Sequence, residues 1–298
     1  MTIDVRTEHG IAVVSLKGDI DLQYSPKLRP TLRAVLGERR SLLVVLAQVK
    51  GVDEMGFAIS LFAESLFWLV MGPSRKQPVR VSAVVAQMME IGIYAVPIIT
   101  VLSSTIGVML AIQGIYTLRW YGAESRVVMG IAMSVVREFS PLITGILVAG
   151  RSGSALAARL GTMRINQEID ALQVMGISPV RFLVVPSLLA MVVMVPILTM
   201  WSNIVALGGA GLYCAGNLDM TLGVYFDQVM ESIRVNDLYH GLGKSLIFGV
   251  LITLVGVVNG ASVSGGAEGV GRMTTRSVVH AISAIVITDM IFVFMVTR

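Results

Sequence analysis

Residues 182–212 read Phe182-Leu-Val-Val-Pro-Ser-Leu-Leu-Ala-Met-Val-Val-Met-Val-Pro-Ile-Leu-Thr-Met-Trp-Ser-Asn-Ile-Val-Ala-Leu-Gly-Gly-Ala-Gly-Leu212 and contain no charged side chain. A helix needs about 20 mostly apolar residues to cross the hydrocarbon core of a bilayer, so this stretch is long enough to span a membrane. Four more stretches qualify in the same way: residues 91–118, 127–150, 245–267 and 277–298. The sequence therefore predicts a mainly α-helical membrane protein with five transmembrane helices.

The composition excludes a water-soluble protein. Hydrophobic residues make up 55% of the 298-residue chain and charged residues 14%, and the mean hydropathy is +0.79, whereas about a quarter of the residues of soluble domains are charged. The net charge of +4 is small and spread along the chain, so no nucleic-acid partner is expected. The single cysteine, Cys214, cannot form an intrachain disulfide, and no Cys/His cluster indicates a metal site.

The first 57 residues have a different pattern, which predicts a small cytoplasmic α/β segment. Residues 11–16 and 42–49 are apolar runs of strand length. Between them, Ser25-Pro26 is typical of a helix start, with proline at the first helical position. The expected order is therefore strand, helix, strand.

Residues 58–71 predict a further helix with an aromatic face, which includes Phe67 and Trp68. Basic residues follow it, so the pattern favours a helix lying in the membrane interface. A core helix of the N-terminal segment is the alternative. The expected organisation is residues 1–57 as the α/β segment, 58–80 as the interfacial helix and linker, and 81–298 as the membrane domain.

The distribution of basic residues predicts the orientation of the spans, because cytoplasmic loops are enriched in Lys and Arg. Basic residues lie before the first predicted span and in the second and fourth loops, at Arg75, Lys76, Arg80, Arg151, Arg159, Arg164, Arg181 and Arg272. The N-terminus is therefore expected in the cytoplasm and the C-terminus on the opposite side.

Arg137 and Glu138 lie midway along the second predicted span. A charge at the centre of a membrane helix costs about 2.5–3.5 kcal/mol unless it is paired or hydrated. Adjacent helical residues point about 100° apart, so at least one of the two is expected to face a cavity or another helix. A role in ligand binding and a buried ion pair with neighbouring spans are both open.

Two other charges border or interrupt apolar stretches. Lys244 precedes the fourth predicted span, where it either extends to the membrane surface or anchors an anionic headgroup. Asp289 lies within the last span without a local partner. The run Gly243-Lys244-Ser245 lacks the first glycine of a phosphate-binding loop, so it does not indicate a nucleotide site.

The segment between the second and third spans predicts an amphipathic cytoplasmic helix. Its apolar residues are interleaved with charged ones, Arg164, Glu168 and Asp170. The apolar set is Leu160, Met163, Ile169, Leu172 and Met175. Such a helix either lies on the membrane or docks into a groove of a partner, and the pattern does not distinguish the two.

Several motifs resemble those of the MlaE/YrbE permeases, the membrane subunits of bacterial lipid-transport ABC systems that work with MCE proteins. They are Arg137-Glu138-x-x-Pro141, Gly150-Arg151-x-Gly153-Ser154, Asp170-Ala171-Leu172-x-x-Met175-Gly176 and Gly265-Gly266-Ala267-Glu268-Gly269. The similarity runs from about Pro73 to the C-terminus.

The resemblance implies a non-catalytic subunit of the bacterial inner membrane, with an interfacial helix and five spans. It implies a homodimer whose central cavity accepts a phospholipid, with Arg137, Glu138 and Lys244 at that cavity. A cytoplasmic ABC ATPase dimer would bind the ATP, so no cofactor is expected in this chain, and an MCE-domain periplasmic protein is the further partner. The ATPase-coupling segment carries over to Arg159, Met163, Arg164, Gln167, Glu168, Asp170, Leu172 and Met175.

The chain departs from the family pattern at four positions. Arg159 and Gln167 replace glutamates, Ser178 replaces an aspartate and Ser187 an arginine. These changes alter charged contacts, so we expect a partner surface adapted to this chain.

Residues 1–57 resemble the first half of a STAS domain, with Val52-Asp53-Glu54-Met55-Gly56 at a position where that fold often has Asp-Ser-Ser-Gly. In related fusions such a domain braces the ATPase. Here the segment is either a half-domain completed by packing on a partner or a truncated remnant. For the whole chain, an ion-gradient-driven transporter that uses Glu138 and Asp289 is the alternative function.

Overall fold

The computed structural model describes residues 2–8, 11–17, 42–45, 54–71 and 80–296. The chain divides into two compact units, Met1–Ser60 and Leu61–Arg298.

The first unit contains a three-stranded sheet in the order β1-β2-β3. The strands are β1 (Thr2–Glu8), β2 (Ile11–Lys17) and β3 (Leu42–Val45). β1 and β2 are antiparallel, whereas β2 and β3 are parallel, with Ala12 opposite Leu42. The sequence predicts β2 and β3 but misses β1. The helix predicted from Pro26 and the end of the second predicted strand lie outside the described residues.

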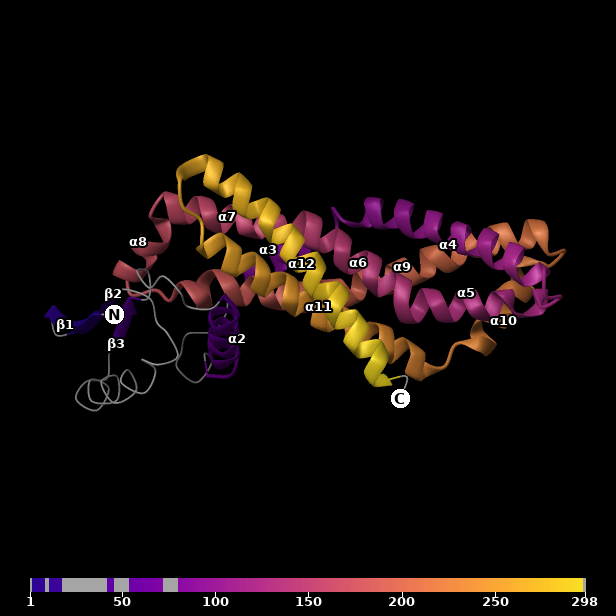
Figure 1. Cartoon of the computed structure of the whole chain (residues 1–298), viewed down its shortest axis with the longest axis horizontal. Helices are drawn as coiled ribbons and strands as arrows, with labels where there is room; N and C mark the ends of the chain where they lie inside the picture. Colours follow the sequence, from indigo (N-terminus) through magenta and orange to yellow (C-terminus); the bar gives the residue numbers. More distant parts are fainter. Residues whose placement is uncertain (1, 9–10, 18–41, 46–53, 72–79, 297–298) are drawn as a thin grey trace. The chain divides into compact units, whose positions relative to one another are not determined.

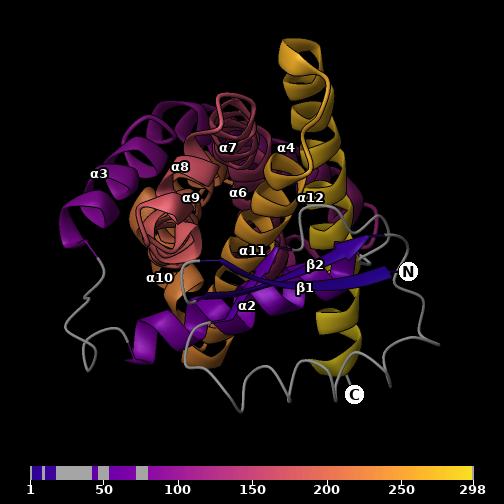
Figure 2. The same cartoon turned by 90° about the vertical axis from the view of Figure 1, so that its left-hand side faces the viewer.

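The second unit is helical. α2 (Glu54–Met71) crosses the division between the units, and α3 (Val81–Gly92) follows. The remaining helices are α4 (Val96–Arg119), α5 (Val127–Ser134), α6 (Ser140–Val148), α7 (Ser154–Ile165), α8 (Glu168–Val174), α9 (Val185–Asn217), α10 (Leu222–Ser232), α11 (Val235–Ala261) and α12 (Gly266–Val296). α4, α6, α9 and α11 run side by side, and α12 crosses α11 obliquely (Figure 1, Figure 2).

Four short turns connect these helices. One is a 3₁₀ turn, η2 (Glu124–Arg126), and three are π-helical turns: η3 (Val135–Phe139), η4 (Ala149–Gly153) and η5 (Val180–Val184). Single π turns within α-helices occur frequently at functional sites. The helical segment from η2 to α7 is continuous, so α5, α6 and α7 belong to one long helical segment, Glu124–Ile165.

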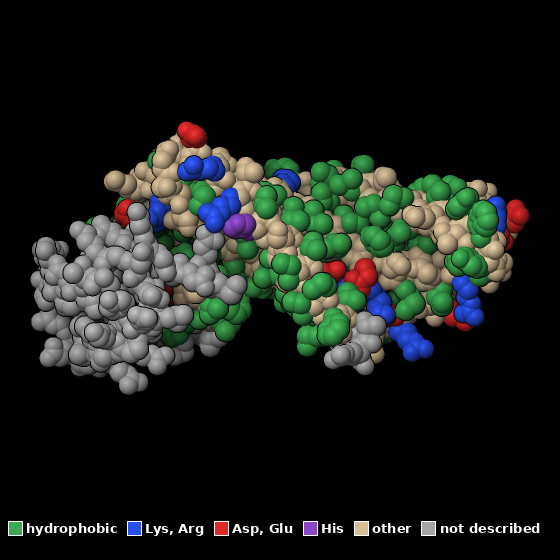
Figure 3. All heavy atoms as spheres, viewed as in Figure 1, with side chains coloured by type: hydrophobic (Ala, Val, Ile, Leu, Met, Phe, Trp, Pro, Cys, Tyr) green, Lys and Arg blue, Asp and Glu red, His purple; other side chains and the backbone are tan. Residues whose placement is uncertain are grey.

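Five helical segments of the described chain are long and apolar enough to cross a membrane, which confirms the predicted number. They are Val96–Arg119, Glu124–Ile165, Val180–Asn217, Val235–Ala261 and Gly266–Met295. Hydrophobic side chains cover much of the middle of the helical unit on the face shown in Figure 3. A surface of this kind suits contact with lipid.

The helix boundaries differ from the predicted spans in several places. The first apolar helix, α4, begins at Val96 because a turn at residues 93–95 separates it from α3, and Pro97 has no N–H to continue the helical ladder. The second apolar helical segment continues to Ile165, fifteen residues beyond Gly150, and Leu156, Ala157 and Leu160 in this extension are buried in the helical unit.

Two hydrophobic cores lie along the helical unit. One joins α4, α5, α9 and α10 through residues such as Val135, Ala210 and Tyr225. The other joins α3, α6, α9, α11 and α12, with Phe248 and Ile285 fully buried. The turn η3 therefore lies at the boundary between the two cores.

Close packing of α11 on α7 depends on two glycines four residues apart. A β-carbon at Gly260 would lie 2.8 Å from Leu160 Cβ and 2.9 Å from the carbonyl oxygen of Ala157. At Gly256 the nearest atom would be the carbonyl oxygen of Gly153, at 3.1 Å. The structure therefore explains this spacing by close backbone approach, as small residues allow in membrane helices.

Candidate functional site

The charged pair of the second span lies in the π turn η3. Pro141 follows this turn, and its missing N–H leaves the carbonyl of Arg137 without its usual helical donor, which favours a wider turn. Gly241 on α11 packs against this turn, because a β-carbon there would overlap the carbonyl oxygen of Val136. α11 thus approaches η3 closely enough for side-chain contacts.

Lys244 is the centre of a charged cluster between three helical segments. Its Nζ lies 2.5 Å from Glu138 Oε2 in η3 and 3.0 Å from Asp289 Oδ1 in α12. The contact with Glu138 is a hydrogen bond, whereas the contact with Asp289 has the distance of an ion pair without hydrogen-bonding geometry. The side chain of Lys244 is fully buried, while that of Glu138 is 35% exposed.

Arg137 points to a different partner. Its Nε lies 3.6 Å from Asp237 Oδ1 in the first turn of α11. The other oxygen of Asp237 accepts a hydrogen bond of 2.9 Å from the backbone N–H of Arg234. Arg137 is 31% exposed, so its guanidinium retains access to a further ligand.

His240 and Phe292 add an aromatic wall to the cluster. Their rings lie edge to face with centroids 4.9 Å apart, and Lys244 Nζ lies 5.7 Å from the Phe292 ring. Both ring nitrogens of His240 are buried without a hydrogen-bond partner among the described residues. Together with the ion pairs, this forms a site with both charged and apolar surfaces.

The predicted Arg137, Glu138 and Lys244 therefore lie together, and Glu138 is ion-paired with a neighbouring span, as one of the two open interpretations states. The interpretation of Lys244 as a charge that extends to the membrane surface is wrong, because it lies inside α11 and is 1% exposed. Sequence reasoning missed Asp237 and His240. The spacing of His240 and Lys244, one helical turn apart, is the signal that could have revealed the histidine.

The predicted amphipathic segment is not one helix. It divides into α7 and α8 at Gln167, whose φ of 59° is left-handed and interrupts the helix. Leu160 belongs to the core, because it packs under Gly260, so it cannot belong to a surface for docking. Met163 and Arg164 end α7 half-buried, whereas Glu168 and Asp170 are exposed on α8.

The end of α8 carries the exposed part of this segment. Val174 and Met175 are 89% and 64% exposed, and Leu172 is half-buried. These residues form an apolar tip outside the spans.

The four departures from the family pattern fall at contacts or turns. Arg159 Nη2 donates a 3.5 Å hydrogen bond to Ser187 Oγ, so two of the changed residues touch each other. Ser178 Oγ donates a 3.4 Å hydrogen bond to Glu64 of α2. Gln167 is the left-handed residue between α7 and α8.

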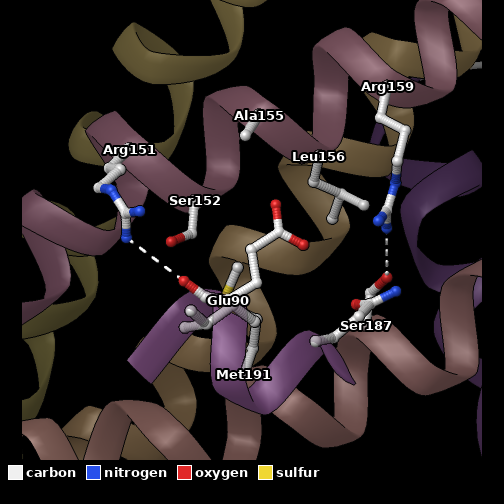
Figure 4. Close-up of a pocket in the computed structure, with 10 residues that line it drawn as sticks. Glu90, Arg151, Ser152, Ala155, Leu156, Arg159, Ser187 and Met191 are labelled. Carbon is white, nitrogen blue, oxygen red and sulfur yellow. Dashed lines mark hydrogen bonds between the residues drawn. The ribbon is translucent and has the colours of Figure 1, made fainter. Parts of the chain in front are cut away.

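A separate pocket of about 220 Å³ lies between α3, the η4–α7 segment and α9 (Figure 4). Its polar lining residues include Glu90, Arg151, Ser152, Arg159 and Ser187. None of the residues of the Lys244 cluster lines this pocket.

Five candidate spans, three of which are joined by ion pairs, indicate a multi-pass membrane protein, and charges within spans often mark substrate or ion pathways. The profile of the family described as Permease MlaE matches residues 84–295. The chain belongs to the MlaE family of ABC transporter permeases.

Similar proteins come from bacteria and a plant. A probable ABC transporter permease protein of Rickettsia prowazekii (strain Madrid E) is 30% identical over 84% of this chain and 99% of its own length. The intermembrane phospholipid transport system permease protein MlaE of Haemophilus influenzae is 31% identical over 66% of this chain and 76% of its own length. The chloroplastic protein Trigalactosyldiacylglycerol 1 of Arabidopsis thaliana is 32% identical over 63% of this chain and 54% of its own length.

Proposed function

We propose that this permease moves phospholipid between the bacterial inner membrane and an MCE-type periplasmic partner, as a homodimer driven by a separate cytoplasmic ABC ATPase. In this proposal the chain itself catalyses no reaction, its N-terminus is cytoplasmic and its C-terminus periplasmic. The similarity to the Haemophilus influenzae protein, whose name states intermembrane phospholipid transport, supports the substrate class.

The observation that carries the proposal is the buried cluster of Lys244, Glu138 and Asp289 within the spans. Charges in membrane helices are retained where they line a pathway or pair with one another. Here the charges pair with one another, and the side chain of Glu138 remains about one-third exposed. A lipid headgroup that passes this site meets charged groups, and its chains meet apolar residues such as Phe292.

Arg137 is the group best placed to receive a phosphate. Its contact with Asp237 is 3.6 Å long, beyond the usual 2.7–3.2 Å of a hydrogen bond, so it is a weak competitor for the guanidinium. Arginine binds phosphate through two parallel charge-assisted hydrogen bonds, which are about twice as strong as neutral ones. We therefore assign Arg137 to the headgroup and Glu138 with Lys244 to the positioning of η3 against α11.

Coupling to ATP hydrolysis is assigned to the segment from Arg159 to Met175. The exposed apolar tip of α8 suits docking on an ATPase, and Glu168 and Asp170 provide a charged rim beside it. ATP binding on the partner would then favour one arrangement of the dimer and change the affinity of the cavity for lipid. Residues 1–57, which resemble half a STAS domain, are proposed to brace the same ATPase.

Removal of the charge at position 138 tests the proposal. Glu138→Gln leaves Lys244 with Asp289 alone, and we expect at least tenfold slower ATP-dependent transfer of labelled phospholipid from proteoliposomes that contain the transporter and its ATPase. Glu124→Gln is the matched control, because Glu124 is an exposed carboxylate at the start of η2 that pairs with Arg119 at the end of α4. We expect its transport rate to be unchanged.

Either of two results would overturn the proposal. One is a normal transport rate in Glu138→Gln with intact assembly. The other is transport that needs an ion gradient and no ATP, which would instead favour proton carriage by Glu138 and Asp289.

A further inference from the structure

The pocket between α3, η4–α7 and α9 contains two cations with weak partners. Arg151 Nη1 donates a 3.4 Å hydrogen bond to the carbonyl of Glu90, and Arg159 Nη2 donates a 3.5 Å bond to Ser187. Both bonds are longer than the usual range for N–H···O, and each guanidinium has five N–H donors. Both groups therefore have donors left for a stronger acceptor.

The carboxylate of Glu90 lies between these cations without an ion-pair partner, and all three charged residues are exposed at the mouth of the pocket. Figure 4 shows the side chain of Glu90 pointing from α3 across the pocket toward α7, between Arg151 and Arg159. Among the described residues no cation lies within 4.0 Å of this carboxylate. The pocket thus presents two positive groups and one negative group that are not satisfied by each other.

This charge arrangement matches a zwitterion better than a simple anion. An anion at the two arginines would place its charge near the unpaired Glu90, whereas a ligand with an ammonium beside its phosphate would pair with all three groups. Ser152 adds a hydroxyl at the same pocket. The volume of about 220 Å³ is below the 300–1,000 Å³ of pockets that hold whole drug-sized ligands, so it admits a headgroup and not the acyl chains.

The surroundings place the pocket where a lipid headgroup lies. Val85 and Met89 of α3, and Ile93 directly after it, are each about half exposed, which suits contact with hydrocarbon. Tyr94 follows α3, is 67% exposed, and packs its ring 5.6 Å from Arg151 Cζ. Exposed tyrosines of membrane proteins concentrate at the level of the headgroups.

We infer that this pocket binds the headgroup of an aminophospholipid from the leaflet on the α8 side of the membrane. Arg151 and Arg159 hold the phosphodiester, and Glu90 holds the primary ammonium. The acyl chains stay in the bilayer. This site is separate from the Lys244 cluster and does not depend on which lipid the permease transports.

Lipid retention of the purified full-length protein tests this inference. The protein is reconstituted into nanodiscs that contain equal parts of phosphatidylethanolamine, phosphatidylglycerol and phosphatidylcholine. It is then extracted in mild detergent, and the lipids that remain bound are identified by native mass spectrometry. We expect the wild type to retain phosphatidylethanolamine in preference to the other two lipids. Phosphatidylcholine is informative because its quaternary ammonium cannot donate a hydrogen bond to Glu90.

Three variants assign the contacts. Arg151→Gln and Arg159→Gln should each retain about tenfold less phosphatidylethanolamine, because each loses a charge-assisted contact with the phosphate. Glu90→Gln should still retain phospholipid but lose the preference for phosphatidylethanolamine over phosphatidylglycerol. Arg272→Gln is the matched control, since Arg272 is exposed near the start of α12 and does not line the pocket.

The outcomes separate the possible ligands. Equal retention in Arg159→Gln and Arg272→Gln overturns the site, as does a wild type without preference among the three lipids. Loss of the bound lipid on addition of inorganic phosphate shows a site for a free anion and also overturns the inference. A melting temperature within a few degrees of wild type in each variant shows that retention was compared between folded proteins.

Discussion

Lys244 holds together two carboxylates that come from different helices, Glu138 in η3 and Asp289 in α12. The lysine side chain is fully buried, and these two carboxylates are its ion-pair partners among the described residues. A buried ion pair contributes little in itself compared with apolar packing, yet breaking one leaves a charge without compensation. Removal of Lys244 is therefore expected to destabilise the protein mainly because it leaves Glu138 and Asp289 without a compensating charge.

We predict that Lys244→Met lowers the free energy of unfolding by about 3 kcal/mol. This is the low end of the usual cost of breaking a buried ion pair, because Glu138 is exposed enough to be hydrated. Unfolding with increasing dodecyl sulfate in mixed micelles measures this. Adding Glu138→Gln and Asp289→Asn to Lys244→Met should recover most of the loss. A triple variant as unstable as the single one would show that the lysine acts through packing and not through its charge.

The sequence indicates which residues are charged within the spans but not which of them meet. Lys244 and Glu138 are 106 positions apart, and no local pattern encodes a contact between two helices at that distance. The partner of Arg137 is also hidden, because Asp237 lies before the predicted start of the fourth span and belongs to α11 only in the structure. Burial of Lys244 likewise depends on the position of α12.

At the scale of helices, the contact between α11 and α7 depends on the absence of side chains. Gly260 faces Leu160 and Ala157 at distances that leave no room for a β-carbon. A β-carbon added at Gly208 on α9 would have no atom of a neighbouring element within 4 Å. The two glycines therefore provide a matched pair for one substitution.

Gly260→Ala should lower the free energy of unfolding by about 1–3 kcal/mol, because the added methyl group forces α11 away from α7. Gly208→Ala should be neutral, or stabilising by up to about 1 kcal/mol, since alanine favours the helix and meets no atom. Thermal unfolding in one detergent compares the two. Equal effects would mean that close packing does not require a glycine at position 260.

Helix ends are the features that the sequence predicts least well. Apolar length reveals five spans, because it depends only on local composition. It cannot show that α7 continues the second span beyond Gly150, since Arg151 and Arg159 make this part resemble a loop. The break at Gln167 is also invisible, because glutamine rarely adopts the left-handed conformation that it has here.

At the scale of the whole molecule, two spans are poorly covered by the rest of the chain. In the most apolar stretch of each span, 28% of the first span and 11% of the last span are buried within the chain. The corresponding share is 50–56% for the other three spans. Such spans face lipid or another protein. In the proposed homodimer, a second copy of the chain would cover part of this surface.

The proposed assembly predicts a specific loss when the tip of α8 is changed. Met175→Glu places a charge on the apolar end that is assigned to the ATPase, so ATPase binding should be lost while the dimer remains. Met230→Glu is the control, because Met230 is 77% exposed on α10, outside the five spans. Native mass spectrometry of the tagged protein, extracted gently from its host membranes, should show two copies with two ATPase subunits for the wild type and Met230→Glu. Met175→Glu should show two copies alone. If it keeps the ATPase, α8 is not the coupling element, and if the wild type carries no ATPase, the proposed assembly is wrong.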